Sequence, residues 1–123
     1  MQVYRWLSLF IVLVLTSSCG KPLPEWKDID MNEWKSDKNG CSGTREKSLE
    51  ILEKQMTTLE ALDEMEIIEF LGKPDENELY KRNQKIYYYY LQPGSPCATA
   101  IVNAKTLTIR FNAMGLAKEI AIE

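Results

Sequence analysis

The chain has 123 residues, with 15 lysines and arginines against 18 acidic residues, a formal net charge of −3 and no histidine. Nucleic-acid binding needs clustered basic residues that neutralise phosphates, so this mildly acidic chain without a basic stripe is not expected to bind nucleic acid. The lack of histidine excludes Ser-His and Cys-His nucleophiles. The sequence also contains no glycine-rich phosphate loop and no Cys-x-x-Cys metal motif. We therefore expect a protein that is not an enzyme and holds no cofactor and no metal ion.

Residues 1–18 have the pattern of a secretory signal peptide. One positive charge, Arg5, precedes a run from Trp6 to Leu15 that is apolar apart from Ser8, and three small residues follow. A run of about ten apolar residues is too short to cross a hydrocarbon core of about 30 Å as a helix. The segment is therefore predicted to direct export rather than to span the membrane.

The end of this segment resembles the lipobox of bacterial lipoproteins. Small residues lead directly into Cys19, although Thr16 stands where that pattern usually has leucine. The resemblance implies a lipid anchor on Cys19, and a plain signal peptide, cleaved or uncleaved, is the alternative. Without Arg5 the chain keeps 14 basic and 18 acidic residues, a net charge of −4 that gives no attraction to anionic lipid, so membrane attachment would be covalent. Many lipoproteins that stay in the inner membrane have an acidic residue directly after the lipidated cysteine. This chain has Gly20 at that position, and the resemblance to lipoproteins therefore implies an outer-membrane location facing the periplasm.

Residues 19–40 are predicted to be a lipid-anchored tether. Pro22 and Pro24 prevent a helix or an inner strand at its start. Trp26 and Trp34 are unusual in a linker and have two interpretations. The favoured one is that they fold back onto the domain core, and the other is that they contact a partner or lipid headgroups.

Cys41 and Cys97 are the two cysteines that follow Cys19. In an exported chain such a pair is more often a disulfide than a metal site or a reactive thiol. A bridge would staple a small domain, stabilising it by about 4 kcal/mol in the chain-entropy model. We therefore predict the Cys41–Cys97 disulfide.

The domain predicted for residues 41–123 begins with two helices. Apolar residues recur at helical spacing from Thr44 to about Gln55, and a second helix begins at Asp63. Asp63 and Glu66 form a variant of the capping box, while Gly72 followed by Pro74 ends the helix.

The remainder reads as β-strands with short connections. The strands are expected at Glu78–Lys81, Lys85–Leu91, Thr106–Asn112 and Leu116–Ile122. Alternation within these strands and their short loops favour antiparallel pairing. The predicted class is α+β, with two N-terminal helices packed on one face of a three- to four-stranded antiparallel meander sheet.

The four consecutive tyrosines of the second strand give the candidate binding site. Ile86 favours a core made by itself, Tyr88 and Tyr90, whereas Leu91 favours Tyr87 and Tyr89, and we follow the first pattern. The partner-binding residues predicted on the open face are then Tyr87, Tyr89, Thr108 and Arg110. The alternative is that they are ordinary sheet residues stabilised by cross-strand neighbours. The loop from Pro93 to Pro96, held by Cys97, is a second candidate surface.

Parts of residues 57–122 resemble the BamE/SmpA/OmlA domain. The resemblance rests on Met65–Asp75 with its Leu-Gly-x-Pro ending, on Tyr87–Tyr90, and on Thr108–Gly115. It implies an outer-membrane lipoprotein that supports the assembly of β-barrel proteins by binding other members of an assembly complex. The cysteine pair and the long segment from Gln92 to Lys105 depart from that pattern, so the chain looks like a divergent member.

Three functional hypotheses remain at this point. The first is a non-enzymatic, BamE-like scaffold that contacts envelope proteins and reaches the membrane through its lipid. The second is a small binding or inhibitory module with an unrelated partner, since a similar fold occurs in β-lactamase-inhibitor-like modules. The third, an enzyme, has no support from a recognisable catalytic set.

Overall fold

The computed structural model describes residues 22–123. The predicted signal peptide, residues 1–18, and the predicted lipidation site Cys19 lie outside the described residues. None of the helices within residues 22–123 is long and apolar enough to cross a membrane.

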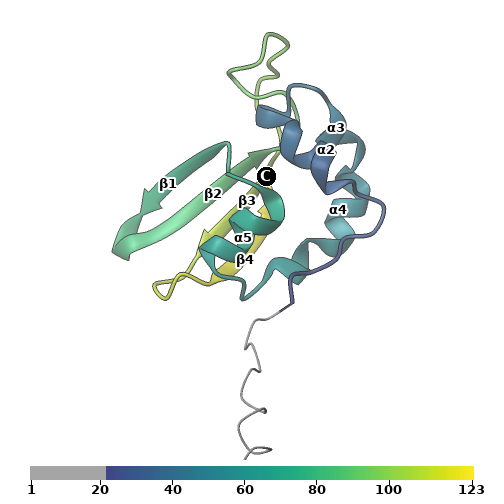
Figure 1. The fold of residues 1–123 in the computed structure, drawn as a ribbon. Helices are drawn as coiled ribbons and strands as arrows, with labels where there is room; N and C mark the ends of the chain where they lie inside the picture. Colours follow the sequence, from purple (N-terminus) through teal and green to yellow (C-terminus); the bar gives the residue numbers. More distant parts are fainter. Residues whose placement is uncertain (1–21) are drawn as a thin grey trace, which may run out of the picture.

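Helices come first along the described chain and a four-stranded antiparallel sheet follows (Figure 1). The helices are α2 (Met31–Ser36), α3 (Thr44–Lys47), α4 (Leu49–Gln55) and α5 (Glu64–Leu71). The strands, in sheet order, are β1 (Glu76–Tyr80), β2 (Gln84–Tyr90), β3 (Thr106–Phe111) and β4 (Ala117–Ile122). The predicted α+β class, with helices preceding an antiparallel meander, is confirmed.

Helix α5 begins and ends at the residues that its local chemistry predicts. The Asp63 carboxylate accepts a hydrogen bond from the Glu66 backbone N–H at 2.8 Å, and Glu66 Oε1 accepts one from the Asp63 N–H at 3.2 Å. This reciprocal capping box satisfies two N–H groups that have no partner within the helix. At the other end Gly72 takes φ +84°, a conformation that favours glycine.

The helix predicted from Thr44 to Gln55 is broken at Ser48, which separates α3 from α4. The Ser48 backbone N–H donates to the carbonyl of Arg45, and its hydroxyl is 3.5 Å from the carbonyl of Thr44. Serine competes in this way for backbone hydrogen bonds and disfavours helix interiors. The predicted helix is therefore two short ones.

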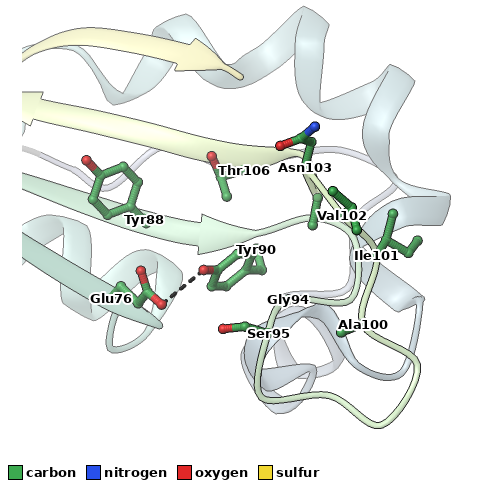
Figure 2. A pocket seen from close by; sticks show the side chains of 11 residues that line it. Glu76, Tyr88, Tyr90, Gly94, Ser95, Ala100, Ile101, Val102, Asn103 and Thr106 are labelled. Atoms are coloured by element: carbon green, nitrogen blue, oxygen red, sulfur yellow. Dashed lines mark hydrogen bonds between the residues drawn. The ribbon is translucent and has the colours of Figure 1, made fainter.

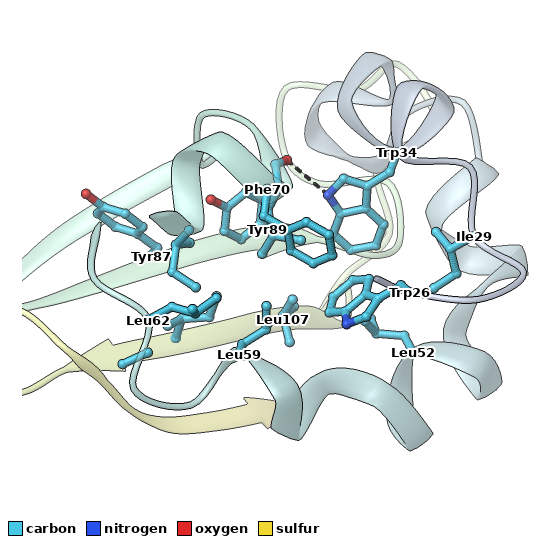
Figure 3. Close-up of a cluster of buried hydrophobic side chains, with 14 of the residues drawn as sticks. Trp26, Ile29, Trp34, Leu52, Leu59, Leu62, Phe70, Tyr87, Tyr89 and Leu107 are labelled. Atoms are coloured by element: carbon cyan, nitrogen blue, oxygen red, sulfur yellow. Dashed lines mark hydrogen bonds between the residues drawn. The ribbon is translucent and has the colours of Figure 1, made fainter. Parts of the chain in front are cut away.

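Residues 26–40, expected to belong to the tether, are part of the domain. Trp26 is 7 % exposed and Trp34 1 %, and their rings meet edge to face with centroids 6.0 Å apart (Figure 3). Trp26 also packs on Phe70 at 4.9 Å, while Trp34 Nε1 donates to the carbonyl of Leu71 at 3.1 Å. The fold-back interpretation of the tryptophans is confirmed, and the predicted start of the domain at Cys41 is wrong. Helix α2, which carries Trp34, was not predicted.

Cys41 and Cys97 form a disulfide with Cα atoms 5.4 Å apart. The bridge joins the α2–α3 region to the segment between β2 and β3, residues 91–105, which we call the stapled loop. The Gly94 N–H donates to the carbonyl of Asn39 at 2.9 Å, a second tie between the same two regions. The stapled loop is thereby held at the end of the molecule opposite to the point where the described chain begins (Figure 1).

Candidate binding face

The strand register divides the sheet into two chemically different faces. Tyr87 and Tyr89 pair with Ile109 and Leu107, and all four side chains are buried in the core (Figure 3). We call this the inner face, and the helices cover it. The opposite, outer face carries residues from all four strands: Glu76, Glu78 and Tyr80 from β1, Ile86, Tyr88 and Tyr90 from β2, Thr106, Thr108 and Arg110 from β3, and Glu119 from β4.

The predicted placement of Tyr87 and Tyr89 on the open face is wrong. They are 7 % and 0 % exposed, and their hydroxyls donate to Glu64 Oε1 at 3.0 Å and to the carbonyl of Gly72 at 2.8 Å. Burial raises the pKa of Tyr87 to about 12, with a further contribution from Glu64. Burial likewise raises the pKa of Tyr89. Both tyrosines are core residues whose hydroxyls fasten the sheet to α5 and to the chain that follows it.

The two predicted residues from β3 do lie on the outer face. Arg110 Nη1 is 3.3 Å from Glu119 Oε2, and its guanidinium lies over the Tyr80 ring at 5.2 Å from the centroid. Thr108, which is 8 % exposed, stands beside Tyr88 in the register. The tyrosines next to Thr108 and Arg110 are therefore Tyr88 and Tyr90, not Tyr87 and Tyr89.

Two tyrosine–glutamate hydrogen bonds cross from β2 to β1 on the outer face. Tyr88 donates to Glu78 Oε2 at 2.7 Å, and Tyr90 donates to Glu76 Oε1 at 3.0 Å (Figure 2). The bond to Glu78, followed by desolvation, raises the pKa of Tyr88 to about 12. Desolvation, followed by the bond to Glu76, raises the pKa of Tyr90. At neutral pH both phenols remain protonated, so they offer aromatic surface and hydrogen-bonding groups rather than general bases.

A pocket of about 590 Å³ opens where the outer face meets the stapled loop (Figure 2). The sheet supplies Glu76, Tyr88, Tyr90 and Thr106. The stapled loop supplies its other wall, including the exposed Ile101 and Val102, which are 45 % and 87 % exposed. Gly94 approaches the Tyr90 ring so closely that a Cβ atom at this position would lie only 2.8 Å from Tyr90 Cδ1. The stapled loop contains the Pro93–Pro96 segment that the sequence singled out as a second surface.

A buried ion pair contacts the backbone of Tyr90, one of the residues that line this pocket. Arg45, 2 % exposed, places Nη1 2.6 Å from Asp75 Oδ2 and donates from Nε to the carbonyl of Trp34 at 2.9 Å. Asp75 also accepts the Tyr90 backbone N–H at 2.8 Å. The Arg45–Asp75 pair thus connects α2 and α3 to Tyr90. Sequence reasoning did not identify Arg45, because nothing in its spacing distinguishes it from the solvent-exposed charges nearby.

Comparison of the chain with protein-family models, with curated proteins and with solved structures finds no match. Within residues 22–123 no group of three His, Cys, Asp or Glu side chains is placed to hold a metal ion. The outer face, with its pocket, is the candidate site that the geometry offers.

Proposed function

We propose that this protein is a lipid-anchored outer-membrane lipoprotein that acts as a non-enzymatic scaffold, binding another envelope protein through the outer face of its sheet. The observation that carries the proposal is the asymmetry of the sheet. Its inner face is buried under the helices, whereas its outer face bears Tyr88, Tyr90 and Arg110 at least partly open to solvent. Tyrosine and arginine are enriched among residues that dominate protein–protein binding energy.

The resemblance of the sequence to the BamE/SmpA/OmlA domain suggests which partner to expect. Members of that family bind components of the β-barrel assembly machinery, and the helix ending Leu-Gly-x-Pro and the Tyr-rich strand are the shared features. The outer face is the surface on which such a component would dock, because the helix-covered face is already occupied by the protein's own core. Cys19 would hold the complex at the membrane.

A second candidate function rests on the stapled loop. Ile101 and Val102 of this loop are exposed, and the Cys41–Cys97 disulfide limits the freedom of the loop. A rigid loop that presents apolar side chains can insert into the cleft of a partner at low entropic cost. This feature favours the inhibitory-module hypothesis, in which the partner is a soluble envelope hydrolase.

A pull-down of the tagged, lipidated protein in mild detergent, followed by mass spectrometry, tests the proposal. The expected result is recovery of the barrel-assembly machinery, and loss of that recovery in the Tyr88→Ala/Arg110→Ala double variant. The matched control is Met65→Ala, which removes an exposed apolar side chain from α5 (73 % exposed). Recovery of one soluble hydrolase, dependent on Val102 and not on Tyr88, would support the second candidate and contradict the first.

A further inference from the structure

The pocket beside the stapled loop has walls of mixed chemistry but only one kind of charge. Its surfaces are the rings of Tyr88 and Tyr90 and the aliphatic side chains of Ile101 and Val102. The carboxylate of Glu76 is the only charged group of the lining, which includes no lysine or arginine. Such a pocket is shaped for a ligand that is apolar along its length and positively charged at its end.

The electrostatic surroundings have the same sign. Glu78 accepts a hydrogen bond from Tyr88, and the charges of Glu78 and Glu123 both act to raise the pKa of that tyrosine, opposed by Arg110. Arg110 itself lies 3.3 Å from Glu119. The three ion pairs found within residues 22–123 include neither Glu76 nor Glu78. These two carboxylates therefore form no direct ion pair with a basic side chain of the described chain.

The adjoining strand indicates that the ligand belongs to a protein. Within the described chain β1 is an edge strand that pairs only with β2, and all five of its residues are exposed. An open edge of this kind can accept an extended segment of another chain by backbone pairing. Glu76 and Glu78, two residues apart on β1, both lie on the outer face of the sheet. A segment that pairs with β1 would therefore place every second one of its side chains beside them. Charged residues on an edge strand can also serve only to prevent edge-to-edge aggregation. A protective role of this kind, unlike a binding site, requires no affinity for a basic peptide.

We propose that this pocket binds a lysine or arginine side chain from an extended segment of a partner protein. The side chain would enter from the β1 edge, with its cationic end beside the Glu76 carboxylate and the Tyr90 ring. Basic side chains bury their stems and keep their charged ends near polar groups, and aromatic faces attract cations. A pocket of about 590 Å³ accommodates either side chain. This inference rests on the proposed scaffold function only in taking the ligand from a protein partner.

The test uses the lipidated full chain in mild detergent and a short capped peptide, Thr-Val-Lys-Val-Thr. Its counterparts carry arginine, or norleucine, which keeps the carbon chain of lysine without the ammonium group, at the central position. Nuclear magnetic resonance shifts report where each peptide binds. We expect the lysine and arginine peptides to shift resonances of Glu76, Tyr90 and the stapled loop, and the norleucine peptide to bind about tenfold more weakly. Binding should also weaken as salt is raised.

Two variants and one control complete the design. Glu76→Gln keeps the shape of the side chain and should weaken the lysine peptide about fivefold, the upper range for an exposed ion pair. Tyr90→Leu should weaken it about tenfold through loss of the ring and its hydroxyl. Glu53→Gln, which removes the charge of an exposed carboxylate on α4, away from the outer face of the sheet, should leave binding unchanged.

Equal binding of the norleucine peptide, or no effect of Glu76→Gln, would overturn the inference. Recovery of an envelope partner that is insensitive to Glu76→Gln would reject the pocket and leave the scaffold function standing. Charge-dependent peptide binding without any recovered envelope partner would support the pocket and reject the scaffold function.

Discussion

Arg45 is the residue whose burial has the clearest energetic consequence. Its guanidinium is enclosed by Asp75, the Trp34 ring at 4.9 Å and the carbonyls of Trp34 and Tyr90. Charge removal from one side of such a pair leaves the other charge buried without compensation. The cost is then much larger than the net contribution of the intact pair.

We predict that Arg45→Met lowers the free energy of unfolding by about 3–5 kcal/mol. The measurement is urea unfolding followed by tryptophan fluorescence. Lys47→Met, at an exposed position of the same helix, is the matched control and should change stability by no more than about 0.5 kcal/mol. Equal stability of the two variants would mean that the Arg45–Asp75 pair does not hold the domain together.

The tyrosines of β2 should make the free energy of unfolding decrease at alkaline pH. The pKa values of Tyr87 and Tyr88 are raised from 10.0 to about 12 in the folded protein. The unfolded chain loses these protons first, so folding is opposed once the unfolded tyrosines begin to ionise. The stability that depends on the protonated tyrosines is fully present below pH 10 and is lost as the pH rises through about 12.

Urea unfolding at a series of pH values should show this fall in the free energy of unfolding. A Tyr87→Phe/Tyr88→Phe variant should be less sensitive to pH above 10, because it cannot lose those two protons. The comparison removes the contribution of lysines, which ionise in the same range in both proteins. Identical pH profiles for the variant and the wild type would contradict the raised pKa values of Tyr87 and Tyr88.

The disulfide acts at the level of elements, because it joins the helical region to the stapled loop across 56 residues of sequence. In the chain-entropy model a bridge of this span contributes about 4 kcal/mol. We predict a loss of that size in the Cys41→Ser/Cys97→Ser double variant, measured by urea unfolding under non-reducing conditions. Wild-type protein treated with reductant should show the same loss. A difference between reduced wild type and the double variant would show that the serines themselves disturb the packing.

Local chemistry made several elements predictable from the sequence. Asp63, Glu66 and Gly72 specify both ends of α5 without help from the rest of the fold. Alternation in β3 separates Leu107, Ile109 and Phe111 from Thr108 and Arg110, and the structure keeps that separation. These features depend on neighbours within one turn or one strand.

Features that depend on tertiary contacts were not predictable in this way. Four tyrosines in a row give no polar–apolar alternation, and Ile86 and Leu91 favour opposite faces. Ile86 is buried on the outer face by its neighbours, being 4 % exposed between Glu78 and Arg110 in the register, so its burial says nothing about the core. Helix α2 has six residues and buries only Trp34, which is too short a pattern to recognise. The pocket depends on the stapled loop folding back over β2.

The proposed lipid anchor on Cys19 implies an orientation of the domain relative to the membrane. Trp26 is fixed in the core, so few residues separate Cys19 from the folded domain, and an extended chain spans at most about 3.6 Å per residue. The domain would then lie close to the membrane. The stapled loop lies at the opposite end from residue 22 and would point away from the membrane (Figure 1).

We predict that Cys19→Ser releases the protein from the outer membrane into the soluble periplasmic fraction. Under the proposed function the acyl chains on Cys19 hold the protein at the membrane, since each buried methylene adds about 0.8 kcal/mol to membrane binding. Cell fractionation with immunoblotting measures the change, and Ser18→Ala, with its small side chain, serves as the matched control. A Cys19→Ser protein that stays with the outer membrane would contradict lipid anchoring.

The most direct test of the central claim is site-specific photo-crosslinking in the cells that produce the protein. A photoreactive amino acid is placed singly at Tyr88 and at Tyr80 on the outer face, and at Met65 on the exposed side of α5. We predict crosslinks to one envelope protein, a component of the barrel-assembly machinery, from positions 88 and 80 and none from position 65. Crosslinks from position 65 alone, with positions 88 and 80 silent, would show that the outer face of the sheet is not the binding surface.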